Sequence, residues 1–274
     1  MTSSGFRLFA HTRLPRDRRR DEHGRCSVCG ARTRFVYNGF VLPAAYAREL
    51  DRDGLADAFR LRESLWCSSC GSSLRVRRLA AVLVEHYGES AETLAELVEE
   101  PAFRALQVLE LNGIGQAHAV LARLPLLTYA EYPQEDVQRL SYADETFDVV
   151  LTSETFEHVP DFRAGFRETL RVLRTGGRHV LTLPALPTRA ESRARATLRD
   201  GEVLHRAPPQ HHGRPSGPFS LVVGRRADML AYTDFGRDVP EELRRAGFEA
   251  HVHWPDDVAS VYCAERGASA QSSR

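Results

Sequence analysis

Four of the five cysteines in this chain of 274 residues form two pairs of equal spacing. Cys26 and Cys29 stand in the segment CSVCG, and Cys67 and Cys70 stand in CSSCG. Two intervening residues allow a tight turn to present both thiolates to one ion, and the glycine that follows lets the backbone aim its N–H groups at the sulfurs. A site of four sulfurs leaves no position for water or substrate, so we predict a structural Zn²⁺. An iron–sulfur cluster and two local disulfides are the alternatives.

A glycine-rich turn predicts a second site. The apolar run LQVLEL indicates a buried strand, and the turn NGIG follows it, with a helical pattern directly after. This order brings backbone N–H groups close to a nucleotide-like ligand at the start of the helix. Glu131 ends the next apolar run about 20 residues downstream, where an acid can accept hydrogen bonds from a ribose diol.

The elements that must position these residues follow from the hydrophobic pattern. Short apolar runs alternate with helical patterns from Val76 onward, which predicts an α/β fold with a parallel sheet covered by helices on both faces. We expect strands at 106–111, 126–132, 147–153, 179–184, 229–235, 250–254 and 258–263. We expect helices at 116–123, 162–173 and 240–246, with further helical patterns at 76–87 and 91–103.

The paired cysteines define a small module in front of the larger α/β domain. We expect this module to contain a strand at 34–41 and a helix at 46–58. About 50 residues bury too little surface to be stable alone, so a structural metal would decide whether the module folds. The predicted organisation is an arm at 1–24, a zinc module at 25–75, the α/β domain at 76–264 with a lid at 186–228, and a tail at 265–274.

Composition excludes several classes of protein. All 37 cationic side chains are arginine, so ordinary pyridoxal enzymes, phosphate-binding-loop hydrolases and kinases, which need a lysine, are excluded. The 37 acidic residues balance this charge, and neither a basic groove nor an aromatic stacking platform indicates nucleic acid as a partner. No apolar run approaches the roughly 20 residues that span a bilayer, and the N-terminus lacks a secretory pattern. We expect a cytoplasmic protein without a membrane partner.

Longer motifs show a resemblance to a known family. The segments EDVQRLSYADETFDVVLTSETFEHV at 135–159 and FRETLRVLRTGGRHVLTLP at 166–184 resemble the class I S-adenosylmethionine-dependent methyltransferases. The segments PPQHHGRP at 208–215 and YTDFGRDVPEELRRAGF at 232–248 are similar to those of a bacterial subgroup with an N-terminal zinc ribbon. The resemblance implies a Rossmann-like methyltransferase sheet, the cofactor S-adenosylmethionine, and a small-molecule acceptor such as a sugar or a secondary metabolite.

The resemblance also implies roles for the matching residues. Those that would contact the cofactor are Glu110, Asn112, Gly113, Gly115, Glu131, Tyr132, Asp136, Val137, Ser153 and Glu154. Among them, Glu131 would hold the ribose hydroxyls, Asp136 and Val137 would lie at the adenine edge, and Ser153 and Glu154 would lie under the methionine portion. The family's first motif carries three glycines at the positions of Asn112, Ile114 and Gln116, so this chain departs from it. Asparagine tolerates the left-handed turn that such a loop requires.

Three histidines are candidate bases for methyl transfer. His158 follows the predicted strand at 147–153, and His211 and His212 lie in the lid segment. Because His212 matches the subgroup's histidine before a glycine, it is the first choice as a base; each of the three could instead serve only to pack or to hold a loop by a hydrogen bond. Two other functions stay open: a non-catalytic docking protein that has lost the cofactor, and a related fold that catalyses another reaction such as a cyclisation.

Overall fold

A six-stranded sheet forms the centre of the computed structural model, which describes residues 22–37, 44–211 and 230–268. In spatial order its strands are β12 (Glu249–His253), β13 (Val261–Glu265), β7 (Leu173–Thr182), β6 (Phe147–Ser153), β4 (Val108–Leu111) and β5 (Leu127–Ala130). Strands β5, β4, β6 and β7 are parallel, whereas β13 is antiparallel to both of its neighbours. The last two strands form a hairpin because the loop between them is too short for a helical crossover.

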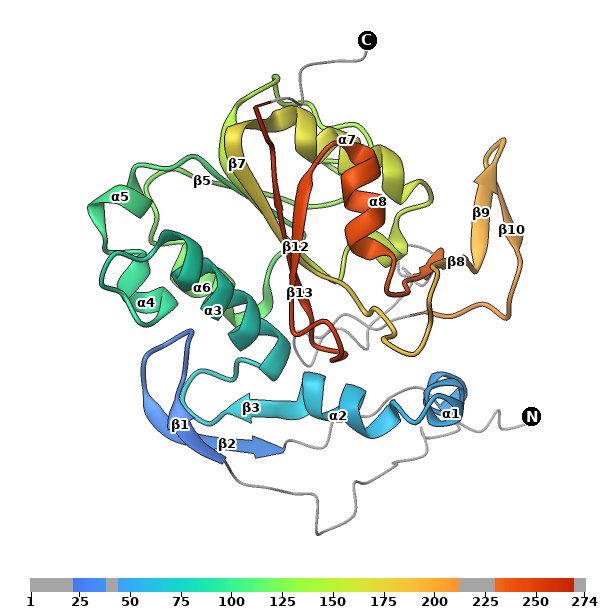
Figure 1. Ribbon diagram of the computed structural model, residues 1–274, viewed down its shortest axis with the longest axis horizontal. Helices are drawn as coiled ribbons and strands as arrows, with labels where there is room; N and C mark the ends of the chain where they lie inside the picture. The colour runs from blue at the N-terminus through green and yellow to red at the C-terminus, as the bar shows by residue number, and fades with distance from the viewer. Residues whose placement is uncertain (1–21, 38–43, 212–229, 269–274) are drawn as a thin grey trace, which may run out of the picture.

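Helices cover both faces of this sheet, as the alternation predicted. One face carries α3 (Leu74–Tyr87), α4 (Leu94–Leu97), α5 (Pro101–Arg104), the 3₁₀ turn η2 (Gly115–Ala117) and α6 (His118–Leu121); the other carries η3 (Phe156–His158), α7 (Phe162–Val172) and α8 (Val239–Ala246) (Figure 1). Within β6, Val149 and Leu151 join one apolar cluster and Val150 joins the other. Side chains alternate between the two faces of a strand, so each face has its own core.

The N-terminal region packs against the end of the sheet where β6 and β7 finish (Figure 1). It consists of an antiparallel sheet of β1 (Glu22–Arg25), β2 (Arg32–Tyr37) and β3 (Leu65–Cys67), with helices α1 (Ala44–Arg52) and α2 (Ala56–Ser64). Strand β1 begins inside the segment that we expected to be an arm. Val28, Phe35 and Leu65 share one apolar cluster with Val76 and Leu79 of α3, so this region and the larger sheet have a continuous core.

Several predicted boundaries were wrong. The helix expected at 46–58 is divided into α1 and α2 around Gly54, which adopts a φ of 69°. The helix expected at 116–123 is a 3₁₀ turn followed by one helical turn, and the segment at 91–103 forms two short helices. The tail expected from Glu265 onward begins with the last residue of β13.

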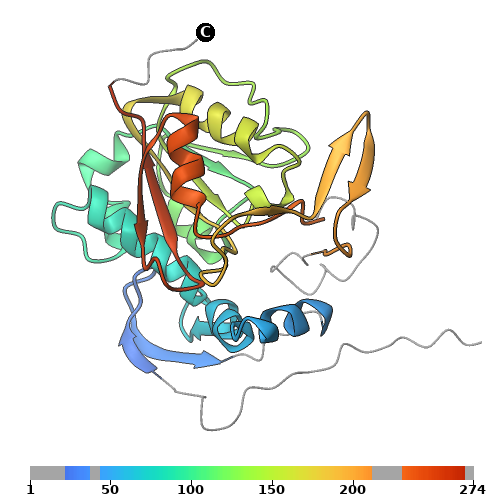
Figure 2. The same ribbon diagram turned by 45° about the vertical axis from the view of Figure 1, so that its right-hand side comes forward.

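The predicted strand at 229–235 was also wrong. Within 230–235, the part of this segment that the structure describes, only β11 (Thr233–Asp234) is a strand, and it pairs with β8 (Arg193–Ala194) outside the central sheet. Strand β13 takes the place beside β7 instead. The neighbouring hairpin of β9 (Ala196–Arg199) and β10 (Glu202–His205) projects from the body (Figure 2). Among the described residues, no helix is long and apolar enough to cross a membrane.

Candidate functional site

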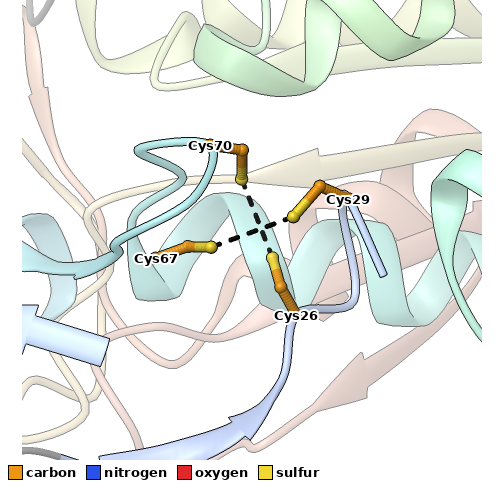
Figure 3. A group of neighbouring side chains, drawn as sticks. All are labelled: Cys26, Cys29, Cys67 and Cys70. Carbon is orange, nitrogen blue, oxygen red and sulfur yellow. Dashed lines mark hydrogen bonds between the residues drawn. The ribbon is translucent and has the colours of Figure 1, made fainter. Parts of the chain in front are cut away.

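Four cysteine sulfurs converge at the junction between the N-terminal sheet and α3 (Figure 3). Cys26 Sγ lies 3.8 Å from Cys70 Sγ, Cys29 Sγ lies 3.9 Å from Cys67 Sγ, and all four atoms lie within 4.8 Å of one another. A tetrahedral Zn²⁺ with Zn–S bonds of about 2.3 Å places its sulfurs roughly 3.8 Å apart. The cluster therefore has the donor atoms and nearly the size that a structural zinc requires.

The two cysteine turns have the same backbone geometry. Gly30 donates to the carbonyl of Cys26 at 2.9 Å, and Gly71 donates to the carbonyl of Cys67 at 2.8 Å. Both glycines adopt a positive φ, 77° and 75°, which a residue with a Cβ rarely adopts. A hydrogen bond between Cys26 and Cys70 lowers the pKa of Cys70 to about 4 and raises the pKa of Cys26.

The glycine loop lies at the carboxyl end of β4 and is held by a buried acid. Glu110 is fully buried, and its carboxylate accepts hydrogen bonds from the backbone N–H of Ile114 at 2.7 Å and from His118 Nδ1 at 2.8 Å. Asn112, Gly113 and Gly115 adopt φ values of 62°, 75° and 52°. The asparagine at the family's first glycine place therefore keeps the left-handed turn, as its chemistry predicts.

The loop after β5 is attached to the glycine loop. Asn112 Oδ1 accepts a hydrogen bond from the backbone N–H of Tyr132 at 2.9 Å, and Tyr129 donates to Glu131. A Cβ added at Gly113 would lie 3.3 Å from the Tyr129 hydroxyl, so a side chain there would crowd this edge. The structure thus brings Asn112, Gly113, Glu131 and Tyr132 together.

Asp136 and Val137 form a separate part of the predicted site. The Asp136 carboxylate accepts hydrogen bonds from the backbone and the side chain of Gln138, at 2.9 and 3.1 Å. Val137 is buried, and its Cγ1 would lie 3.3 Å from a Cβ on Gly165 in α7. These contacts hold the Asp136 loop against α7.

Ser153 and Glu154, at the end of β6, contact arginines that sequence reasoning did not assign to the site. Arg62 of α2 binds both carboxylate oxygens of Glu154, with Nη1 at 2.8 Å, and donates to the Leu183 carbonyl. Arg75 of α3 donates to Ser153 Oγ. Glu154 thus forms an ion pair with α2 and adopts a φ of 51°.

One acid links the two arginines. Glu63 accepts from Arg62 Nη1 at 2.5 Å, and from Arg75 Nε and Nη2 at 2.8 and 3.0 Å. The only sequence signal for this group was charge at positions that a helical pattern would bury, as in LRVRRLAAVLV. This signal did not apply to Arg62, because the helix predicted at 46–58 ended before this residue, whereas α2 includes it.

The candidate histidines lie in three different surroundings. His158 is mostly buried; its Nδ1 donates to the Leu230 carbonyl at 3.0 Å, and its Nε2 lies 3.6 Å from Glu157 Oε1. His211 is exposed and forms an isolated backbone bridge with Leu230. His158 and the backbone of His211 therefore both contact the backbone of Leu230. His212, the first choice as a base, lies outside the described residues.

Comparison with known proteins shows that part of the chain is similar to methyltransferases. A family model for the methyltransferase domain matches residues 78–181. Demethylmenaquinone methyltransferase of Mycobacterium marinum is 32% identical over 136 residues, which are 50% of this chain and 56% of that protein. The chloroplastic 2-methyl-6-phytyl-1,4-hydroquinone methyltransferase 1 of Oryza sativa subsp. japonica is 26% identical over 154 residues, 56% of this chain and 41% of that protein. The chain spans about half the length of these curated relatives.

One solved structure spans most of this chain at low similarity. Among solved structures, the 1,6-didemethyltoxoflavin-N1-methyltransferase of Burkholderia thailandensis, with bound S-adenosylhomocysteine, has a TM-score of 0.43 and 16% identity, over 86% of this chain and 96% of that chain. The helix-covered sheet has a Rossmann-like arrangement. The segment that is similar to a methyltransferase domain, residues 78–181, runs from within α3 to within β7.

Proposed function

We propose that this protein transfers a methyl group from S-adenosylmethionine to a small-molecule acceptor. The observation that carries the proposal is the loop at the carboxyl end of β4, where Asn112, Gly113 and Gly115 all adopt a positive φ. The loop lies at the carboxyl end of a parallel strand, where open α/β folds bind nucleotides. The retained loop geometry also argues against a docking protein that has lost its cofactor.

In this proposal the bound cofactor supplies an electrophilic methyl group on a sulfonium, and the protein supplies binding and orientation. Glu110 holds the glycine loop through Ile114 and His118, while Glu131 and Tyr132 lie beside the loop as candidate contacts for the ribose. Asp136 and Val137 are the proposed contacts at the adenine edge. Ser153 and Glu154 lie at the neighbouring strand end and are the proposed contacts for the methionine portion.

A base is needed where the acceptor atom is an oxygen or nitrogen that must lose a proton. We propose His158, with His211 and His212 as the alternatives. Donation from its Nδ1 to the Leu230 carbonyl leaves Nε2 of the neutral ring as the proton acceptor. Glu157, 3.6 Å from Nε2, would stabilise the charged ring after the proton transfer.

The proposed acceptor is a small organic molecule. The names of the curated relatives refer to demethylmenaquinone and to a phytyl hydroquinone. A hydroquinone or quinone ring therefore joins the sugar and the secondary metabolite as acceptor classes for the first screen. A non-methylating reaction such as a cyclisation would show itself by cofactor binding without consumption of the methyl group.

We further propose that Cys26, Cys29, Cys67 and Cys70 bind one Zn²⁺. The equal geometry of the two turns and the sulfur separations near 3.8 Å support this assignment. With four protein ligands the metal has no open position for a substrate, so its role in this proposal is structural.

Calorimetric titration with S-adenosylmethionine and S-adenosylhomocysteine tests the proposed cofactor site. We expect micromolar binding by the wild-type protein and at least tenfold weaker binding by Gly113→Ala, whose new Cβ would lie 3.3 Å from the Tyr129 hydroxyl. Gly201→Ala is a matched control, because Gly201 has a φ of 81° and no atom within 4 Å of its Cβ position. Absence of binding up to millimolar cofactor would overturn the proposed function and favour a docking protein.

A further inference from the structure

Two buried arginines, Arg62 and Arg75, contact residues at the carboxyl end of β6, where the proposed cofactor site lies. Both bind Glu63, but only Arg62 also binds a second acid. Arg62 is 1% exposed and Arg75 is 5% exposed. The terminal nitrogens of Arg62 contact the carboxylates of Glu154 and Glu63 and the carbonyl of Leu183. Two acids thus neutralise Arg62, and its contacts bind α2 to the sheet.

Arg75 directs one nitrogen at a neutral group. Its Nε and Nη2 atoms bind the two oxygens of Glu63, at 2.8 and 3.0 Å, and its Nη1 donates to the hydroxyl of Ser153. A guanidinium held on one edge by a carboxylate keeps its orientation and still offers hydrogen-bond donors on the other edge. Glu63 therefore positions Arg75 so that Nη1 points at the carboxyl end of β6.

The same turn of α3 also touches the glycine loop. Val76 follows Arg75, and its Cγ2 would lie 3.6 Å from a Cβ on Gly115. Gly71, just before α3, lies close to the residue after Gly115: a Cβ added at Gly71 would lie 3.7 Å from Cγ of Gln116. The first turn of α3 therefore contacts both the loop after β4 and the end of β6 at Ser153.

S-adenosylmethionine carries a carboxylate at the end of its methionine portion, and such a group needs a cationic partner when it is bound away from water. The chain contains no lysine, so arginine is its side chain with a permanent positive charge. We propose that Arg75 binds the carboxylate of the cofactor's methionine portion and that Glu63 is its positioning residue. This inference rests on the proposed function, and it assigns the charge recognition within that site.

Two ligands that differ in the carboxylate test the proposal. S-adenosylhomocysteine carries the amino-acid group, and 5′-methylthioadenosine has the same adenosine and sulfur without it. We expect Arg75→Met to weaken binding of S-adenosylhomocysteine by roughly 10- to 100-fold, the range for a lost charge-assisted hydrogen bond, and to leave binding of 5′-methylthioadenosine within about twofold. Glu63→Gln should weaken the first ligand by a smaller factor, because it releases the guanidinium without removing it.

Arg78→Met is the matched control. Arg78 lies on the same helix, but its Nη2 binds Asp257 Oδ2 at 2.9 Å on another side, so binding of both ligands should stay as in the wild type. Arg75→Lys keeps the charge and serves in place of Arg75→Met if that variant does not fold, as judged by circular dichroism and zinc content; its loss should again be confined to S-adenosylhomocysteine.

An equal loss for both ligands, or no loss for either, would overturn the assignment to Arg75 while the proposed function stands. Failure of the wild-type protein to bind either ligand would instead overturn the proposed function itself.

Discussion

Replacement of Arg62 by methionine should destabilise the whole protein, because its charge is buried and its partners cannot be solvated in its place. Arg62 is 1% exposed, and it contacts both oxygens of Glu154, one oxygen of Glu63 and the Leu183 carbonyl. Removal of one partner from a buried ion pair costs about 3–5 kcal/mol, since the remaining charge is left without compensation. For a chain of this size that loss corresponds to a melting temperature lower by roughly 6–20 °C.

Urea denaturation of the zinc-loaded protein, followed by circular dichroism, measures this loss. Arg167→Met is the matched control, because Arg167 is 60% exposed and lies 3.8 Å from an equally exposed Asp161; we expect a change below about 1 kcal/mol there. Glu154→Gln should cost less in the Arg62→Met background than in the wild type, with a coupling of about 1–3 kcal/mol in the double-mutant cycle.

The reasoning would be refuted if Arg62→Met lost no more stability than Arg167→Met, or if the cycle showed no coupling. Either result would mean that the arginine and Glu154 are not a buried pair that joins α2 to the sheet.

Three further predictions concern the metal, a buried histidine and the proposed base. Protein purified without chelator should contain about one zinc per chain; Cys29→Ser should lose it and bind S-adenosylhomocysteine more weakly, whereas Cys263→Ala should retain it, and zinc-free wild-type protein would contradict this. Burial lowers the pKa of His179 to about 3, below its value of about 6.5 in the unfolded chain, so the unfolded state takes up the proton first and stability falls as the pH drops below 6.5. His179→Gln should therefore lose about 2 kcal/mol less unfolding free energy than the wild type between pH 7.5 and pH 5, and equal losses would exclude this origin. His158→Gln should lower kcat by about 10²- to 10⁴-fold with cofactor affinity within twofold, and a loss below threefold would argue against His158 as the base.

Predictions that rest on local spacing agree well with the structure. Each cysteine pair forms a short turn that ends in glycine, and both glycines adopt a positive φ. The strand at 147–153 was predicted at its observed limits, because a strand buried on both faces has a continuous apolar centre, here Val149 to Leu151. The loop after β4 keeps its left-handed turn at Asn112 because that conformation is a local property of the residue.

Local sequence patterns could not predict the contacts between segments that are far apart along the chain. Arg62 and Glu154 are 92 positions apart, and Arg75 and Ser153 are 78 apart, so no local period links them. The failed strand at 229–235 has the same cause, because β11 pairs with β8, about 40 positions away, and its own apolar pattern does not specify that partner.

The amino-acid sequence by itself determined the class of fold, the two cysteine turns and the loop that the cofactor would meet, since each depends on patterns that are local along the chain. Only the tertiary structure decided how the N-terminal region meets the sheet. Burial made Glu63, Arg62 and Arg75 one charged group at the end of β6, because a buried charge is stable only beside its opposite. Through that group, the module that carries the four cysteines lies beside the proposed methyltransferase site.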